Sequence, residues 1–242
     1  MKGKAGFKKY ISIAVLLLLG ILFIAKFGGP AILRLYIETG IGTCSKIPIL
    51  CLAPEGTINS EINKAYAAEL VPHKFPQMAI SIPMTISIPK GFSIVQQRTK
   101  RVYYKKRRPE QKQPIIYLLR QEPGFFINLY PRLKKEGIAD DYEFLKRVMY
   151  AKPADIKDIT GAFFLIMKSI FIPDLGDQRN AKMAQFSIAG RKGFINYNLA
   201  GPEHYFDCNV INAQGAFFKI YIKDKGANLD LDKVLTIVST VN

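Results

Sequence analysis

One short segment holds a nucleophile, a base and two acids within six positions, Glu203-His204-Tyr205-Phe206-Asp207-Cys208. Such residues can perform covalent catalysis when the thiol lies within hydrogen-bond reach of the imidazole. In a strand, alternate residues share a face and each residue rises ~3.3 Å, so His204 and Cys208 would lie about 13 Å apart. Cys208 also shares its face with Phe206 and Val210, which predicts a buried, inert thiol. The segment therefore predicts no catalytic site.

A second polar group offers the oxygen ligands that calcium prefers, and it consists of Asp224, Asn228, Asp230 and Asp232. Its spacing departs from the EF-hand pattern and no later bidentate Glu follows. Capping of a C-terminal helix explains Asp230 and Asp232 more simply. The chain also has two histidines and no C-x-x-C, P-loop, G-x-S-x-G or H-E-x-x-H motif. We therefore predict no metal site and no cofactor.

Three cysteines are present, Cys44, Cys51 and Cys208. In an oxidising compartment, Cys44 and Cys51 can close a small loop across SKIPIL, which leaves Cys208 unpaired.

The most distinctive polar feature is the basic segment, defined as residues 96–112, QQRTKRVYYKKRRPEQK. Its eight cationic side chains face one acid, Glu110, and two tyrosines stand in the middle. Such a mixture can hold an anionic lipid surface or an acidic protein partner. A hairpin tip whose charges are simply solvated is the alternative. The candidate binding residues are Arg98, Lys100, Arg101, Tyr103, Tyr104, Lys105, Lys106, Arg107, Arg108 and Lys112.

The elements that position these residues follow an N-terminal stretch typical of membrane insertion. Four lysines within the first ten residues precede an uncharged run of 15 residues, Ile11–Ala25. Because lysine is costly to carry across a bilayer, the head should stay in the cytoplasm and the rest should lie outside. The residues after Ala25 offer no good A-x-A cleavage site, and Lys26 can lengthen the effective span. We expect an uncleaved single-pass signal anchor, with a cleaved signal peptide as the alternative.

The charge of the remainder bears on its partners. Without residues 1–26 the chain keeps 30 basic and 19 acidic residues. Outside the cytoplasm such a domain meets phospholipid headgroups or anionic wall polymers, so we expect no nucleic-acid partner, although single strands bind similar basic and aromatic mixtures. Charge that only keeps the domain soluble is the alternative.

The order of periodicities predicts an α+β fold with a mostly antiparallel sheet covered by helices. Strands are expected at TISIP, FSIV, VYYKK, IIYLLR and FFINLY, then at MAQFSIA and FINYNL around a turn at residues 190–193, and at YFDCNVI and AFFKIYIK. Helices are expected after Asp140, along 156–170 with a buried face including Ile159, Ile166 and Ile170, and at the C-terminus after Asn228 or Asp230. We divide the chain into head and transmembrane anchor (1–30), connector (31–75) and extracytoplasmic domain (76–242).

This order resembles the PsbP-like α/β/α sandwich, a family named for an extrinsic subunit of photosystem II. The resemblance rests on ISIPKGFSIV and on the C-terminal run FSIAGRKGFINYNL, YFDCNVIN, AFFKIYIK and LDLDKVLTIVSTV. It covers residues 76–242 and implies a binding or assembly role in an extracytoplasmic, membrane-tethered domain, with no site residues.

The sequence thus predicts a non-catalytic binding or accessory domain of a membrane complex. A cell-envelope hydrolase and a secreted ligand-binding protein released by signal cleavage are the alternatives. The oligomeric state is left open.

Overall fold

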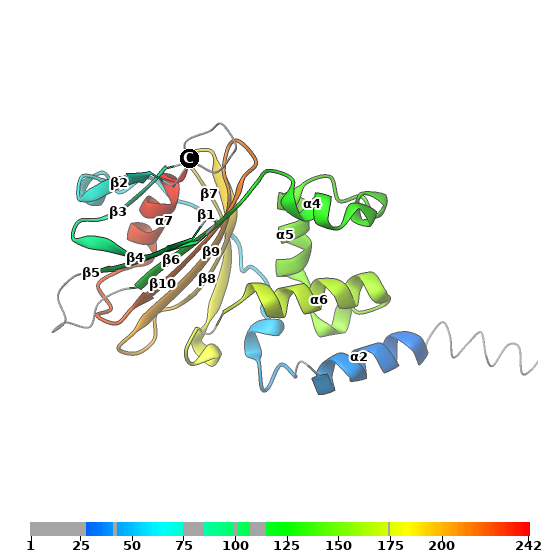
Figure 1. Ribbon diagram of the computed structural model, residues 1–242. Coiled ribbons are helices and arrows are strands. Elements are labelled where there is room, and N and C mark those ends of the chain that lie inside the picture. The colour runs from blue at the N-terminus through cyan, green and yellow to red at the C-terminus, as the bar shows by residue number, and fades with distance from the viewer. Residues whose placement is uncertain (1–27, 41–42, 75–84, 99–100, 107–114, 174) are drawn as a thin grey trace, which may run out of the picture.

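The computed structural model describes residues 28–40, 43–74, 85–98, 101–106, 115–173 and 175–242. The strands are β1 (Thr57–Asn59), β2 (Leu70–Lys74), β3 (Thr85–Pro89), β4 (Phe92–Arg98), β5 (Arg101–Lys106), β6 (Ile115–Gln121), β7 (Lys182–Ile188), β8 (Arg191–Asn198), β9 (His204–Ile211) and β10 (Phe217–Asp224). Eight of them form one sheet in the order β1-β7-β8-β9-β10-β6-β5-β4 (Figure 1). β1 runs parallel to β7 and the other neighbours are antiparallel. The predicted α+β class with a mostly antiparallel sheet is confirmed.

Helices cover both faces of this sheet (Figure 1). The helical elements are α2 (Gly29–Gly40), η2 (Pro48–Leu50), α3 (Lys64–Ala67), α4 (Phe125–Leu129), η3 (Pro131–Glu136), α5 (Asp141–Tyr150), η4 (Pro153–Asp155), α6 (Ile159–Phe171), η5 (Gln178–Asn180) and α7 (Leu231–Ser239). α7 and the β2–β3 pair cover one face, whereas α4, α5 and α6 cover the other. The layers follow from strand alternation, because Phe218, Ile220 and Ile222 of β10 face α7 while Phe217 faces the opposite layer.

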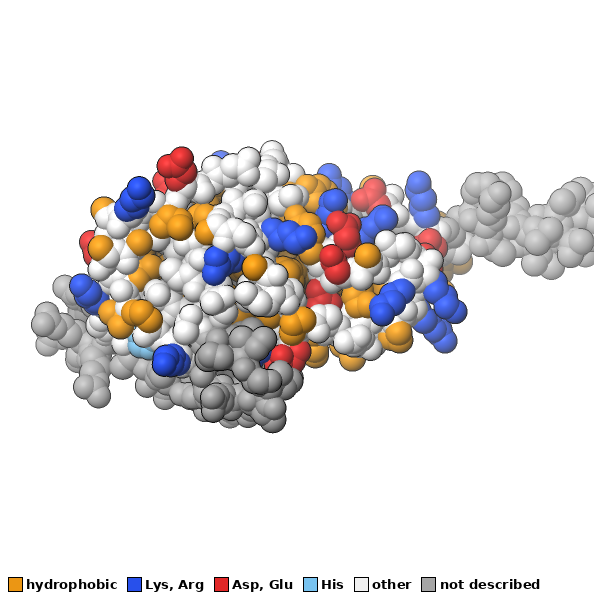
Figure 2. All heavy atoms as spheres, turned by 90° about the horizontal axis from the view of Figure 1, so that it is seen from above, with side chains coloured by type: hydrophobic (Ala, Val, Ile, Leu, Met, Phe, Trp, Pro, Cys, Tyr) orange, Lys and Arg blue, Asp and Glu red, His pale blue; other side chains and the backbone are white. Residues whose placement is uncertain are grey.

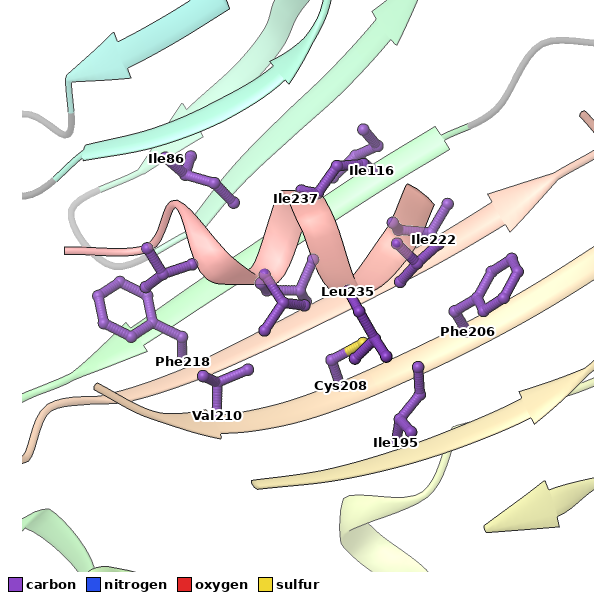
Figure 3. Close-up of a cluster of buried hydrophobic side chains, with 14 of the residues drawn as sticks. Ile86, Ile116, Ile195, Phe206, Cys208, Val210, Phe218, Ile222, Leu235 and Ile237 are labelled. Carbon is purple, nitrogen blue, oxygen red and sulfur yellow. The ribbon is translucent and has the colours of Figure 1, made fainter. Parts of the chain in front are cut away.

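The core under α7 is built mainly of apolar side chains. Leu235 of α7 lies beside Cys208 of β9, whereas Ile237 lies beside Ile116 of β6 (Figure 3). Asp230 caps the helix, since its side chain accepts a hydrogen bond of 2.9 Å from the amide of Lys233. The predicted C-terminal helix and its cap are confirmed.

The opposite core is rich in phenylalanine. The ring of Phe126 lies 4.8 Å from that of Phe144 and 5.0 Å from that of Phe217, which joins α4, α5 and β10. Asp140 caps α5 by accepting a hydrogen bond of 2.8 Å from the amide of Glu143, as predicted.

The prediction of a strand at FFINLY is wrong, because these residues form α4. Gly124 precedes α4 with a left-handed φ of +74°. Asp141 then accepts hydrogen bonds of 3.0 and 3.1 Å from the amides of Phe126 and Ile127. A carboxylate from α5 thereby holds the first turn of this short helix, a contact that local sequence cannot reveal.

The predicted face of α6 is buried only in part: Ile156, ahead of the helix, and Met167 are buried. Ile159, Ile166 and Ile170 are 80%, 40% and 68% exposed, whereas Leu165 and Lys168 on the other side are fully buried. Because α6 is apolar almost all round, periodicity alone does not select the side that packs.

Residues 31–75, interpreted from the sequence as a connector, contribute α2, β1 and β2 to the fold. β1 adds to the sheet edge beside β7, and β2 pairs with β3. α2 packs on α6, where Ile37 contacts the cluster that contains Ala162 and Leu165. Over the described ranges no helix is long and apolar enough to cross a bilayer; the predicted anchor, Ile11–Ala25, lies outside them.

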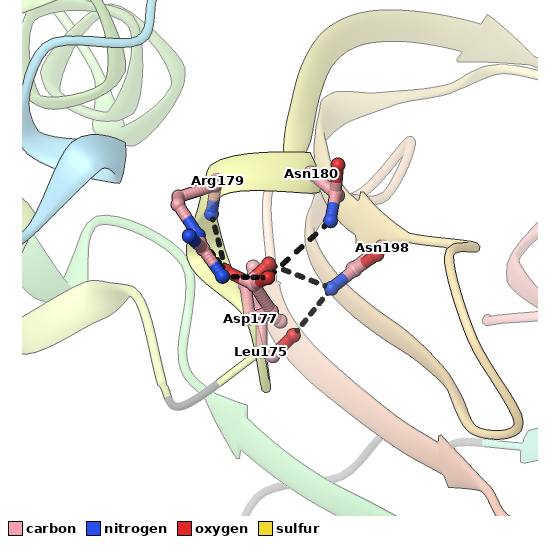
Figure 4. Close-up of polar contacts among 5 residues, drawn as sticks. All are labelled: Leu175, Asp177, Arg179, Asn180 and Asn198. Carbon is pink, nitrogen blue, oxygen red and sulfur yellow. Dashed lines mark hydrogen bonds and ion pairs between the residues drawn. The ribbon is translucent and has the colours of Figure 1, made fainter.

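The return from α6 to the sheet is fixed by Asn198, which is 2% exposed. Its Nδ2 donates to the carbonyls of Leu175 and Asp177, each at 3.0 Å (Figure 4). The Asp177 carboxylate in turn accepts hydrogen bonds of 2.9 and 2.8 Å from Arg179 Nε and Nη2. These contacts hold the loop that connects α6 to β7.

The turn that joins β7 and β8 is shorter than predicted. It consists of Ala189 and Gly190, with φ values of +48° and +76°. Gly193, expected in the turn, lies within β8 opposite Val210. A Cβ at position 193 would lie 2.0 Å from the carbonyl oxygen of Asn209, so this approach of two strands requires glycine.

Candidate functional site

The basic segment maps to one end of the sheet. Arg98 is the last residue of β4, the terminal strand, and Arg101, Tyr103, Tyr104, Lys105 and Lys106 lie in β5, the next strand. Arg98 pairs with Arg101 in the β4–β5 register. Lys100, Arg107, Arg108 and Lys112 lie outside the described residues. The structure thus brings the described part of the segment onto two neighbouring strands.

The acid, base and thiol of segment 203–208 are separated, as the strand geometry predicts. His204 Nδ1 lies 2.8 Å from the carbonyl oxygen of Leu229. Cys208 is fully buried under α7, and burial raises the pKa of its thiol well above the usual value. The prediction of a buried thiol is confirmed, and its raised pKa disfavours the reactive thiolate.

Glu203 forms a hydrogen bond and an ion pair at the surface. It accepts a hydrogen bond of 2.5 Å from the Tyr205 hydroxyl and pairs with Lys223 Nζ at 3.0 Å. The hydrogen bonds from Tyr205 and then Lys223 lower the pKa of the Glu203 carboxyl. The carboxylate is thereby held ionised, and a general acid would need the opposite shift.

Sequence reasoning missed a buried polar cluster, which consists of Asn196, Asp207, Asn209 and Lys219. Asp207 Oδ2 accepts hydrogen bonds of 3.1 Å from both asparagine amides, and Asp207 Oδ1 lies 3.0 Å from Lys219 Nζ. The strand register causes this meeting, because Asn196 pairs with Asp207 and Asn209 pairs with Lys219. The sequence pattern that could have revealed this cluster is the presence of polar residues at alternate positions of β8, β9 and β10, which are otherwise apolar.

This cluster also binds the helical layer to the sheet. Lys219 Nζ donates to the carbonyl of Phe171, the last residue of α6. Within the described part of the chain, Asn196 Oδ1 and Asn209 Oδ1 accept no hydrogen bond. Asp207, Asn196 and Asn209 are all fully buried, so the cluster offers no surface on which a substrate could bind.

A second polar group that the sequence did not reveal is Lys168 of α6, which is fully buried. Its Nζ donates to the carbonyl of Ala151 at 2.9 Å, to that of Leu50 at 3.4 Å and to that of Leu52. Burial, and then Lys152, lower the pKa of Lys168 to about 7. Its ammonium ties the end of α5 and the η2 loop to α6.

The η2 loop is also closed covalently. The structure joins Cys44 and Cys51 in a disulfide, with their Cα atoms 5.6 Å apart, and Cys208 carries the free thiol. Ile49 and Leu50, between the bonded cysteines, are buried. The disulfide therefore supports the packing of the segment beside α2 and α6.

An open cavity of about 370 Å³ lies between the start of α5, α4 and the β9–β10 turn. Asp140, Asp141, Lys134 and Lys192 contribute charge to its lining, and Asn212 an amide. Asp141 is 3% exposed, and burial raises the pKa of its carboxyl, an effect that the amides of Ile127 and Phe126 oppose. Both acids serve as helix caps, which accounts for their position.

The acids near the C-terminus stabilise a loop. Asp224 is fully buried and accepts hydrogen bonds from the amides of Gly226 at 3.0 Å and Leu229 at 2.6 Å. Throughout the ranges that the structure covers, no group of three His, Cys, Asp or Glu residues could hold a metal ion.

The chain matches no known protein family, and no curated protein is similar to it in sequence.

Proposed function

We propose that this chain is a membrane-anchored, extracytoplasmic domain of PsbP-like architecture that acts by binding, as an accessory or assembly factor, and performs no catalysis. Two sequence features support the location, the lysine-rich head and the uncharged run Ile11–Ala25. The proposed partner surface is the basic segment at the β4–β5 end of the sheet, and its proposed ligand is anionic lipid or an acidic membrane-protein partner.

The observation that carries the non-catalytic role is the structural use of the reactive side chains in segment 203–208. Cys208 lies in an apolar core, Asp207 holds two asparagines and a lysine, and His204 contacts a backbone carbonyl. Each group therefore has a local partner that explains its position. This arrangement favours binding over the alternative of a cell-envelope hydrolase.

The test is charge reversal of the basic segment in the full chain. Replacing Lys105, Lys106, Arg107 and Arg108 with Glu should abolish crosslinking of the segment to anionic lipid in reconstituted liposomes, or the recovery of crosslinked partners from native membranes. Coulomb attraction to an anionic surface contributes about 1 kcal/mol per cation, so four reversals remove most of it. The measurement is crosslinking to lipid in liposomes and to protein in native membranes, each identified by mass spectrometry.

A charge-matched control uses four exposed cations of the helical layer, Arg132, Lys135, Lys146 and Arg147. Basic and acidic side chains lie intermixed over this part of the molecule (Figure 2). Their replacement with Glu changes the net charge equally and should leave both measurements unchanged. If the two quadruple variants behave alike, or neither differs from the unmodified chain, the proposed surface is rejected. Mass spectrometry of the mature N-terminus distinguishes the anchored form from a secreted ligand-binding protein released by cleavage.

A further inference from the structure

Helix α2 presents three strips of different character. Leu33 and Ile37, four residues apart, pack toward α6. Arg34 and Glu38, also four residues apart, form a second strip and are joined by an ion pair of 2.8 Å. The first strip fixes the helix to the domain and the second is a solvated polar surface.

The third strip of α2 is apolar and uncovered. Ile32, Leu35 and Tyr36 are 64%, 61% and 75% exposed, and their spacing places them on one side of the helix. Thr39 continues this strip, and its hydroxyl donates to the carbonyl of Leu35 at 2.9 Å. The Thr39 hydroxyl is thus satisfied within the helix and needs no water.

Exposed apolar side chains are also frequent on α6, against which α2 packs. Eleven large hydrophobic side chains of the described residues are exposed, and six of them lie on these two helices. On α6 they are Ile159, Ile166 and Ile170. A strip of exposed apolar side chains such as that of α2 marks a surface that can meet another apolar phase.

The position of α2 in the chain indicates that this apolar phase is a lipid bilayer. Its first residue, Gly29, stands four residues after Ala25, the last residue of the uncharged run. Four residues span at most about 14 Å, and a headgroup layer is roughly 5–8 Å thick on each side. If the run crosses a bilayer, as the proposed function requires, α2 must begin within or beside the headgroups.

From these observations we infer that α2 lies along the bilayer, with Ile32, Leu35 and Tyr36 in its interfacial region, and that this contact orients the domain. An amphipathic helix binds a membrane interface in this way, with its apolar side below the headgroups and its charged side in water. The inference rests on the proposed anchor. It adds a second, non-spanning contact made by the folded domain itself. With α2 on the bilayer, the β4–β5 end of the sheet lies on the opposite side of the molecule (Figure 1), so the basic segment would then face an acidic partner and not this lipid surface.

The test places an environment-sensitive nitrobenzoxadiazole label at single introduced cysteines of the full chain. The native cysteines are protected, because Cys44 and Cys51 are bonded and Cys208 is buried. The test positions are Leu35→Cys and Tyr36→Cys. Each labelled chain is reconstituted into vesicles of phosphatidylcholine and phosphatidylglycerol, with and without brominated acyl chains.

Two control positions match the test positions. Arg34→Cys lies on the charged strip of the same helix. Val71→Cys is an exposed apolar position on β2, at the opposite end of the molecule from α2 (Figure 1). Labels at 35 and 36 should show blue-shifted emission and lose intensity with brominated lipid, whereas labels at 34 and 71 should emit as in water.

Three other results would overturn the inference, and they differ in what else they reject. If the chain floats with the vesicles but all four labels emit as in water, the contact of α2 is rejected while the anchor stands. If labels at 35 and 36 are blue-shifted without quenching by brominated lipid, protein covers the strip. If the chain does not float with the vesicles at all, the proposed anchor and this inference both fail.

Discussion

In the folded chain the Lys168 ammonium donates hydrogen bonds to three backbone carbonyls in place of water. Its protonation is therefore coupled to folding. Its pKa is lowered to about 7 in the folded chain, while an unfolded lysine titrates near 10.5. Between these values the unfolded chain binds the extra proton, so the free energy of unfolding should rise as the pH rises from about 7 to 10. The rise is at most about 4 kcal/mol, since the three carbonyl acceptors favour the ammonium.

The measurement is urea unfolding in detergent solution at the two ends of this pH range. Lys168→Met should lose this pH-dependent gain and should be less stable than the wild type by about 1–3 kcal/mol at about pH 10, where the folded lysine is neutral, because the carbonyls lose their donor. Lys146→Met on the exposed side of α5 is the control and should keep the wild-type pH dependence. An unchanged slope in Lys168→Met would contradict the prediction.

Asp207 should tolerate substitution poorly, because its carboxylate neutralises a lysine in a buried site. Asp207→Asn leaves the Lys219 ammonium, with a side chain only 16% exposed, without a counter-charge. We expect a loss of about 3 kcal/mol in the free energy of unfolding, and the double variant Asp207→Asn/Lys219→Met should recover much of it.

The control for this cycle is the surface ion pair on the same two strands. Glu203→Gln breaks the pair with Lys223, whose side chains are 29% and 30% exposed, and should change stability little. If Asp207→Asn lowered the free energy of unfolding as little as Glu203→Gln, the buried ion pair would contribute no more to stability than the surface pair, and the prediction would be wrong.

These residues show which site features can be read from sequence. The caps at Asp140 and Asp230 depend on a neighbour three residues away, and the burial of Cys208 depends on alternation within one strand, so all three were predictable. Asp207 and Lys219 meet only through the register of β9 and β10. A lone lysine in a helix ordinarily predicts a solvated side chain, so Lys168 gave no signal of its burial.

At the level of elements, the pairing of β8 with β9 depends on the close approach at Gly193. Gly193→Ala places a Cβ against the backbone of Asn209 and should cost at least about 2 kcal/mol, because a strand cannot move away without losing its ladder. Ala189→Gly, four residues earlier, should stabilise the turn by about 0.5 kcal/mol, since φ there is +48°. Thermal unfolding of both variants provides the measurement, and a neutral Gly193→Ala would disprove the steric argument.

Element type was predictable where the period was clear and failed where it was ambiguous. The strands β6 to β10 alternate apolar residues between two buried faces and were identified, with the exception of one turn. FFINLY has no such alternation, and its helix depends on Asp141 from another element. In α6 the buried side was decided by where α2 and the sheet lie, which is tertiary information.

For the molecule as a whole, the sheet is two antiparallel meanders joined side by side. One consists of β4, β5 and β6, the other of β7 to β10, and β6 meets β10 at the seam. The sequence order predicted successive strands in both regions and a mostly antiparallel sheet, but not this seam. It also gave no sign that Thr57–Asn59 would add a parallel strand at the far edge, because three residues are too few for a period to show.

The disulfide loop has a mechanical consequence. A pull from the N-terminal side enters the fold at α2 and would reach β1, a three-residue edge strand, if the chain between them could extend. The Cys44–Cys51 bond limits how far the chain between α2 and β1 can extend. The hydrogen bonds from Lys168 to the carbonyls of Leu50 and Leu52 transmit part of the force to α6. A force applied at α2 would therefore load this helix and the covalent bond before the hydrogen bonds between β1 and β7.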